Sequence, residues 1–299
     1  MRSHTIAHYP ANGQNPPITT NNVRGQDMKQ KIITTMLATL SVLLLWLPAH
    51  GSENDEYPNR ALYPDVKIIT TDALYQNLDK SIIVDVRSRY EYDTLHIKGA
   101  HNIPLNSPQF VEEIRKLAAE HPDRQIVFYC NGKTCRKSYK AARRARKYDV
   151  DNVLAYDAGI FDWARAHPDE AVLLGKSPVP ADRLISKETF KKHLLEPEAF
   201  LEKAHQPGAI VIDIRDIRQR EGISLLPPGQ EQREPLDNEA LRKHVERARK
   251  ENRPLLIYDA VGKQVRWLQY FLEQEGVKDY WFMQGGIKAY LDGLQSTYR

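Results

Sequence analysis

The chain of 299 residues contains an internal duplication with a period of about 128 residues. The repeat constrains the fold strongly, because each copy is long enough to form a domain that buries its own core. Where one repeated apolar run ends, the first copy has Cys130 and the second has Asp259. If the chain has one chemical centre, we expect it at Cys130. The matching segments are IIVDVR at 82–87 and IVIDIR at 210–215, IVFYC at 126–130 and LLIYD at 255–259, and DAGI at 157–160 and QGGI at 284–287.

The first 51 residues have the pattern of an export signal and not of a folded domain. A basic start, MKQK at 28–31, precedes an uncharged, mostly apolar run from Ile32 to Leu47 that ends in PAHG at 48–51. This pattern predicts a signal peptide over about residues 28–51, with a start at Met28 and cleavage before Ser52. The predicted localisation is periplasmic or secreted. An uncleaved membrane anchor is the alternative, although the run is shorter than the roughly 20 residues that cross a bilayer.

The charge balance of the exported part argues against a nucleic-acid partner. The excluded segment contributes four of the 43 basic residues and one of the 39 acidic residues, which leaves 39 basic and 38 acidic residues. Binding to the phosphate backbone needs a basic surface, and a nearly neutral chain gives no indication of one. The excluded charged residues are Arg2, Arg24, Lys29, Lys31 and Asp27.

Both cysteines of the chain, Cys130 and Cys135, lie in one short stretch. An exported protein usually encounters an oxidising compartment, where disulfides persist. A bridge between two residues only five apart would stabilise a large chain little, because it closes a very small loop. The pair therefore indicates chemistry more than scaffolding. The ten histidines show no spacing with the cysteines that would predict a metal site, and no cofactor is expected.

Short apolar runs alternate with amphipathic stretches in both copies, which predicts an α/β fold with buried parallel strands. Helices are expected after Ser107-Pro108, over Ser138–Tyr148 and after Asp237. The Pro- and Gly-containing stretch 168–180 predicts the boundary between a domain at 58–175 and a second at 181–299. The expected strands are Ile82–Val86, Ile126–Tyr129 and Val153–Tyr156 in the first copy, and Ile210–Ile214, Leu255–Tyr258 and Tyr280–Met283 in the second.

Cys130 follows directly on a predicted strand and precedes a predicted helix. Backbone N–H groups near a helix N-terminus stabilise an anion, so this position should favour a cysteine thiolate. Asn131-Gly132 supplies the backbone freedom that such a loop needs. The alternative is a buried apolar cysteine without reactivity. Cys135 could be a resolving thiol, a disulfide partner or a packing residue.

A basic cluster follows the loop. We expect Arg136, next to the loop, to be functional, whereas Arg143 to Lys147 fit a solvated helix face because Ala141, Ala142 and Ala145 would point inward.

Taken together, several segments of the first copy resemble the rhodanese family. The resemblance covers about residues 65–170, and a degenerate copy covers about 181–299. The segments are DVR at 85–87, Glu91, HIKGAHNIP at 96–104, YC at 129–130 and AGIFDW at 158–163.

The resemblance implies two domains, each with a parallel five-stranded sheet flanked by helices. It implies that Cys130 is the catalytic nucleophile of a sulfurtransferase, which takes the outer sulfur of an anionic donor such as thiosulfate, holds it as a persulfide and passes it to a thiol acceptor. That acceptor could be a protein thiol. Asp85, Arg87 and His96 match framework positions, and we interpret Asp85 and His96 as structural hydrogen-bonding groups. The substrate-binding residues implied are Asn131, Gly132, Lys133, Thr134, Cys135 and Arg136.

Two departures leave other chemistry open. Cys130 lies 29 positions before Gly159, whereas Asp259 lies 27 before Gly286, so two extra residues are expected in the first loop. Arg136 also stands at C-x5-R spacing from Cys130, as in cysteine phosphatases and arsenate reductases, and could clamp an oxyanion bidentately. The alternatives are thus thiol–disulfide or oxyanion chemistry with Cys135 and Arg136, and a non-catalytic binding module. The second copy is expected to be inactive, because Asp259 cannot act as a sulfur nucleophile, and to serve as a packing partner.

Overall fold

The computed structural model describes residues 56–220 and 224–297. The predicted signal segment, with its start at Met28 and its cleavage point, lies outside the described residues and stays a prediction. In the part of the chain that is described, no helix is long and apolar enough to cross a membrane. The two copies form two α/β domains, each with its own parallel sheet.

The first sheet has four strands in the order β3-β1-β4-β5. The expectation of five strands was therefore wrong for this domain. The fifth position is reduced to one parallel bridge between Ile68 and Ala155. Only two hydrogen bonds form there, Ile69 N to Ala155 O and Ala155 N to Lys67 O, before the Thr70 side chain caps the next helix. The strands are β1 (Ser81–Asp85), β3 (His101–Asn102), β4 (Gln125–Tyr129) and β5 (Val153–Tyr156).

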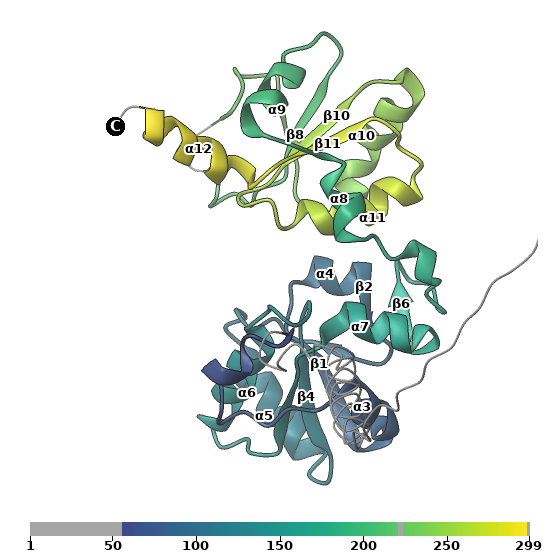
Figure 1. Cartoon of the computed structure of the whole chain (residues 1–299), viewed down its shortest axis with the longest axis vertical. Coiled ribbons are helices and arrows are strands. Elements are labelled where there is room, and N and C mark those ends of the chain that lie inside the picture. The colour runs from purple at the N-terminus through teal and green to yellow at the C-terminus, as the bar shows by residue number, and fades with distance from the viewer. Residues whose placement is uncertain (1–55, 221–223, 298–299) are drawn as a thin grey trace, which may run out of the picture. The chain divides into compact units, whose positions relative to one another are not determined.

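Helices cover both faces of this sheet (Figure 1). α5 (Phe110–Glu120) and α6 (Lys137–Arg146) pack on the side chains of Ile82, Val84 and Phe128. α3 (Thr71–Gln76) and α7 (Gly159–Ala166) pack on the opposite face, against Ile83, Val127 and Tyr129. Alternate residues of each strand therefore enter two separate cores, as expected for buried parallel strands. The remaining elements are α4 (Arg89–Thr94), the antiparallel pair β2 (Leu95–Ile97) and β6 (Ala171–Leu173), and the 3-10 turns η1 (Arg60–Leu62), η2 (Leu78–Lys80), η3 (Pro168–Glu170) and η4 (Ala181–Arg183).

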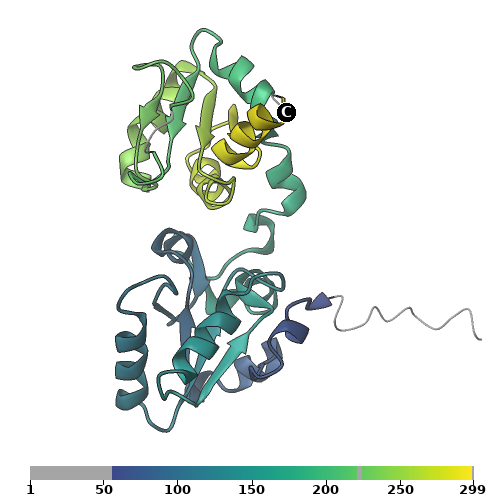
Figure 2. The same cartoon turned by 90° about the vertical axis from the view of Figure 1, so that its left-hand side faces the viewer.

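The second sheet has five strands in the order β7-β11-β10-β8-β9. β7 pairs with β11 through two residues, where the first domain has the single bridge. Within each domain, strands lie between helices in both views (Figures 1 and 2). The elements are α8 (Lys187–Lys191), β7 (Leu194–Leu195), α9 (Pro197–Ala204), β8 (Ile210–Asp213), β9 (Gln232–Arg233), α10 (Asn238–Glu251), β10 (Leu255–Tyr258), α11 (Val265–Gln274), β11 (Tyr280–Met283) and α12 (Gly286–Thr297).

The expected strands are confirmed to within one residue at each end, and the expected helices form. Asp237 caps α10 as anticipated, accepting a bond from Ala240 N at 2.9 Å. α6 begins at Lys137, one residue before the expected start, and α5 begins at Phe110, two residues after Pro108. The apolar periodicity of the sequence therefore located the elements, while their ends depend on local capping.

The register of the sheets brings corresponding residues to one edge of each. Asp85 pairs with Tyr129 at the carboxyl ends of β1 and β4, and Val86 N donates to Tyr129 O. The residues that follow, Arg87 and Cys130, therefore leave the sheet at the same edge. The second domain repeats this geometry with Asp213 and Tyr258.

Candidate active site

Cys130 is the first residue after β4, and 1% of its surface is exposed. Its carbonyl accepts a bond from Ile160 N at 3.1 Å, near the start of α7. Its Sγ forms a disulfide with Cys135 and lies 3.8 Å from Ser138 Oγ, which is completely buried in α6. The strand–loop–helix setting expected for a nucleophilic cysteine is present, and the structure shows it in its oxidised form.

The loop after Cys130 runs from Asn131 to Arg136, and Cys135 N donates to Gly132 O across it at 2.8 Å. Gly132 has a φ of +150° and lies against the chain at Ala158-Gly159. A Cβ at Gly159, whose φ is +74°, would collide with the backbone of Gly132, so only glycine fits at this crossing. The loop is thus held on one side by the start of α7.

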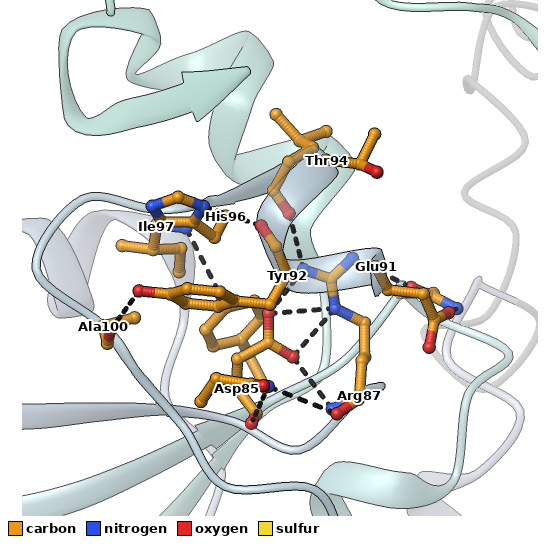
Figure 3. A network of polar contacts seen from close by, with 12 residues as sticks. Asp85, Arg87, Glu91, Tyr92, Thr94, His96, Ile97 and Ala100 are labelled. Carbon is orange, nitrogen blue, oxygen red and sulfur yellow. Dashed lines mark hydrogen bonds and ion pairs between the residues drawn. The ribbon is translucent and has the colours of Figure 1, made fainter. Parts of the chain in front are cut away.

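A buried polar network fixes the beginning of the loop (Figure 3). The Arg87 guanidinium is fully buried and donates to both carboxylate oxygens of Asp85, to Leu95 O at 2.6 Å and to Asn131 Oδ1 at 3.2 Å. Asn131 Nδ2 in turn donates to Glu91 Oε1 at 2.9 Å. The side chain of Asn131, predicted to bind substrate, is therefore engaged in holding the loop next to Cys130.

Glu91 belongs to a capping box at the start of α4, where its carboxylate accepts from Ser88 N and Ser88 Oγ. Burial raises the pKa of Glu91, but Arg87, Lys137 and the bonds from Asn131 and Ser88 outweigh burial and bring this pKa below its usual value. Glu91 thus remains ionised next to the loop.

His96 has a structural place, in agreement with the interpretation from sequence. Its Nδ1 bonds to Tyr92 O at 2.7 Å, and its ring stacks on the Tyr92 ring at 4.0 Å between centroids (Figure 3). Burial lowers the pKa of His96, which favours the neutral ring.

The two cationic side chains of the loop both contact the segment Glu56–Arg60, which we call the N-terminal strap. Lys133 Nζ lies 2.6 Å from Glu56 Oε1 and 3.0 Å from Asp162 Oδ2, and these contacts raise the pKa of Lys133, the bond to Glu56 most of all. Arg136 is exposed, and its Nε donates to Asn59 Oδ1 at 3.1 Å. Asn59 Nδ2 also donates to Lys133 O at 3.1 Å.

Sequence reasoning missed the strap because it has no apolar periodicity. Thr134, the remaining loop residue predicted to bind substrate, is exposed. The contact of Ser138 with Cys130 was not predicted either, because it depends on where α6 places the Ser138 hydroxyl.

The second copy shows what the same loop does around a carboxylate. Asp259 is 3% exposed and accepts four backbone N–H bonds, from Val261 and Gly262 at Oδ1 and from Gln264 and Val265 at Oδ2. The bonds from Val261 and Gln264 measure 2.9 and 2.6 Å. The loop between this strand and this helix is therefore built to surround an anion.

The first loop is only one residue longer than the second, which corrects the expectation of two. Six residues separate Cys130 from α6, and five separate Asp259 from α11. The other extra residue follows α6, where six residues precede β5 against five before β11. An insertion after a helix leaves the loop unchanged, so the first loop is less enlarged than the residue count suggested.

The basic cluster of α6 is a surface feature, as expected from its spacing. Arg143 and Arg146 form ion pairs with Asp65, and Ala141, Ala142 and Ala145 are buried. Within residues 56–220 and 224–297, no group of three His, Cys, Asp or Glu side chains is placed to hold a metal ion.

Curated relatives of this chain match part of its length. The chain is 28% identical over 144 residues to tRNA uridine(34) hydroxylase of Salmonella arizonae, covering 46% of this chain and 39% of that protein. The enzyme of the same name from Salmonella heidelberg is 29% identical over 112 residues, or 35% of this chain and 30% of that protein. The chain thus covers less than two-fifths of the length of these relatives.

Solved structures with a similar chain include thiosulfate sulfurtransferase from Pseudomonas aeruginosa, at 18% identity and a TM-score of 0.32, covering 77% of this chain and 45% of that one. A human single-domain sulfurtransferase is 23% identical with a TM-score of 0.28, covering 33% of this chain and 96% of that one.

The family model of the rhodanese-like domain matches this chain twice, at residues 70–166 and 194–292. The two matches fall on the two sheets described above and together cover more than half of the chain. The duplication, the pair of parallel sheets and the loops at Cys130 and Asp259 agree with this assignment. The chain therefore belongs to the rhodanese-like domain family and contains that domain in two copies.

Proposed function

We propose that this chain is an exported sulfurtransferase that carries sulfane sulfur as a persulfide on Cys130. The observation that supports this best is the pair of equivalent loops. In the second copy, four backbone N–H groups surround the Asp259 carboxylate, and the corresponding loop of the first copy follows the buried Cys130. Amide groups that stabilise a carboxylate would equally stabilise a thiolate and its anionic persulfide. Export rests on the signal-peptide pattern alone.

The reaction begins with reduced Cys130. Its thiolate attacks the outer sulfur of a donor such as thiosulfate, and a new S–S bond forms while the S–S bond of the donor breaks. Sulfite leaves with the bonding electron pair, and the outer sulfur remains on Cys130. A thiol acceptor then takes this sulfur, which restores the Cys130 thiolate.

Thiol–disulfide chemistry is the second candidate, and the Cys130–Cys135 disulfide favours it. A Cys135 thiolate can attack Cys130 Sγ of the persulfide, so that the outer sulfur leaves as hydrosulfide with the electron pair. The two thiols are then oxidised to the disulfide, and an external dithiol must return two electrons. An oxyanion clamp by Arg136 has less support, because its guanidinium bonds to Asn59.

Intact-mass measurement of the mature chain tests both sulfur transfer at Cys130 and resolution of the persulfide by Cys135. After reduction and removal of the reductant, the Cys135→Ser variant should gain the mass of one sulfur on exposure to thiosulfate, whereas Cys130→Ser should not. The wild-type chain should lose two hydrogens and release hydrosulfide if Cys135 resolves the persulfide. If reduced Cys135→Ser gains no sulfur, sulfur transfer at Cys130 is ruled out. If the wild-type chain keeps its added sulfur and forms no disulfide, the resolving role of Cys135 is ruled out.

A further inference from the structure

We propose that Asn59 is a positioning residue that holds Cys135 against Cys130. Its side-chain amide contacts the loop on both sides of Cys135: Nδ2 donates to Lys133 O at 3.1 Å, and Oδ1 accepts from Arg136 Nε at 3.1 Å. Asn59 itself is 3% exposed. One buried amide therefore fixes the residue two positions before Cys135 and the residue directly after it.

Such a restraint matters because a single backbone hydrogen bond lies within the described loop itself, from Cys135 N to Gly132 O. Two thiols five residues apart form a disulfide only in some loop conformations, so the conformation decides their effective concentration. Asn59 adds two bonds from a segment more than seventy residues earlier in the chain, and these select the conformation in which the two sulfurs meet.

The strap is itself anchored to rigid elements. Arg60 Nε lies 2.8 Å from Asp157 Oδ2, and that carboxylate also accepts from Tyr139 Oη of α6 at 2.6 Å. Asp157 is 2% exposed and follows β5 directly. Asn59 is thus tied through its neighbour to the sheet and to the helix that follows the loop, which allows it to hold the loop in place.

A consequence follows for the redox equilibrium of the pair. If Asn59 favours the conformation in which the sulfurs meet, it stabilises the disulfide over the dithiol. It would also speed attack by Cys135 on a Cys130 persulfide, an effect that rests on the proposed function. The effect on the dithiol–disulfide equilibrium does not rest on the proposed function, because this equilibrium involves no sulfur donor.

Titration of the full mature chain against reduced and oxidised dithiothreitol measures this equilibrium. The Asn59→Leu variant keeps the branched shape and the number of heavy atoms of the side chain but removes both hydrogen bonds. We expect it to weaken the disulfide about tenfold, which corresponds to a potential about 30 mV less negative. Asn152→Ala is the matched control, because Asn152 Nδ2 donates to Arg124 O at the opposite ends of the strands, and it should leave the potential unchanged.

Hydrogen exchange on the wild-type chain gives a second test that needs no variant. Coupling is reciprocal, so reduction of the disulfide should speed exchange in the strap while leaving α3 unchanged. An unchanged potential in folded Asn59→Leu, or equal exchange in the strap of oxidised and reduced protein, would overturn the proposal. Failure of the proposed sulfur transfer would appear separately, as the absence of sulfur labelling in Cys135→Ser.

Discussion

The two copies of the domain share the backbone arrangement around Cys130 and Asp259 but carry different chemical groups at these positions. In each, the first residue after a buried strand is itself buried, and an Asp–Arg pair lies at the end of the neighbouring strand. In the second copy that first residue is Asp259, whose carboxylate accepts four loop N–H bonds. In the first copy it is Cys130, in a disulfide with Cys135. The comparison teaches that the loop of the second copy surrounds a permanent anion, whereas a cysteine occupies the equivalent position of the first copy.

The arginines of the two buried Asp–Arg pairs, Arg87 and Arg215, also differ in their further hydrogen bonds. Arg215 Nη1 donates to Gln219 O within its own turn, whereas Arg87 Nη1 donates to Asn131 Oδ1 in the loop after Cys130. The first copy thus connects its buried ion pair to the residue beside the cysteine.

The largest expected difference is in reactivity. Cys130→Ala should reduce thiosulfate-dependent sulfur labelling by about 1,000-fold or more, because the nucleophile is gone. Asp259→Asn should leave the labelling rate within about twofold of the wild type. Rates of labelling by mass spectrometry would measure both, and an equal loss in the two variants would remove the distinction between the copies.

The next effect concerns stability. Replacing Arg87 by methionine leaves the buried Asp85 without its cationic partner, which should cost about 3–5 kcal/mol of unfolding free energy. Arg215→Met should cost less, because Arg220 Nε lies 3.9 Å from Asp213 Oδ2 and keeps a cation next to that carboxylate. Only Arg87→Met should also change the alkylation rate of reduced Cys130, because Arg87 bonds to Asn131. Urea unfolding and iodoacetamide kinetics measure the two effects. A similar change in alkylation for Arg215→Met would contradict the division of roles.

Removal of the internal carboxylate should have a smaller effect on stability. Asp259→Ala leaves four loop N–H groups without their acceptor, for which we expect a loss of about 2–3 kcal/mol. Sulfate should recover part of this loss, since it can occupy the vacated site, and it should not stabilise the wild-type second domain through this loop. Thermal unfolding with and without sulfate, compared with sodium chloride at equal ionic strength, provides the measurement. Absence of any sulfate effect on the variant would argue against an anion site.

The smallest effect is on pH dependence. Glu91 has a lowered pKa in the folded state, because its attraction to Arg87 and Lys137 and its bond from Asn131 outweigh burial. Its contribution to stability is therefore complete above the ordinary carboxyl pKa of 4.5 and is lost as the pH falls through the lowered value. The second copy has Gln219 at the corresponding position, which does not titrate.

Unfolding free energies between pH 5 and pH 3 check this contribution. Glu91→Gln should flatten the acid dependence of the first domain, and a variant as acid-sensitive as the wild type would show that Glu91 does not supply it.

Much of the fold could be predicted from the sequence, because apolar runs and their repetition locate the buried strands. The fifth strand of the first sheet could not, since a single bridge at Ile68 differs from β7 by only one residue pair. The position of Cys130 was predictable from its strand and loop. The partners of Lys133 and Arg136 were not, because Glu56 and Asn59 lie in a polar segment without periodicity, and only tertiary structure brings them to the loop.

The hydrogen-bonded carboxylate of Asp259 indicates which substitutions of the cysteine a rhodanese-like domain can tolerate. A loop shaped to close on a charge would be left with unsatisfied backbone groups if its reactive residue were replaced by an apolar one. Aspartate avoids this, because its carboxylate accepts the loop N–H bonds and the loop keeps its conformation without a bound anion. A single substitution at this position can therefore replace the cysteine of such a domain while the backbone N–H groups of its loop keep an acceptor.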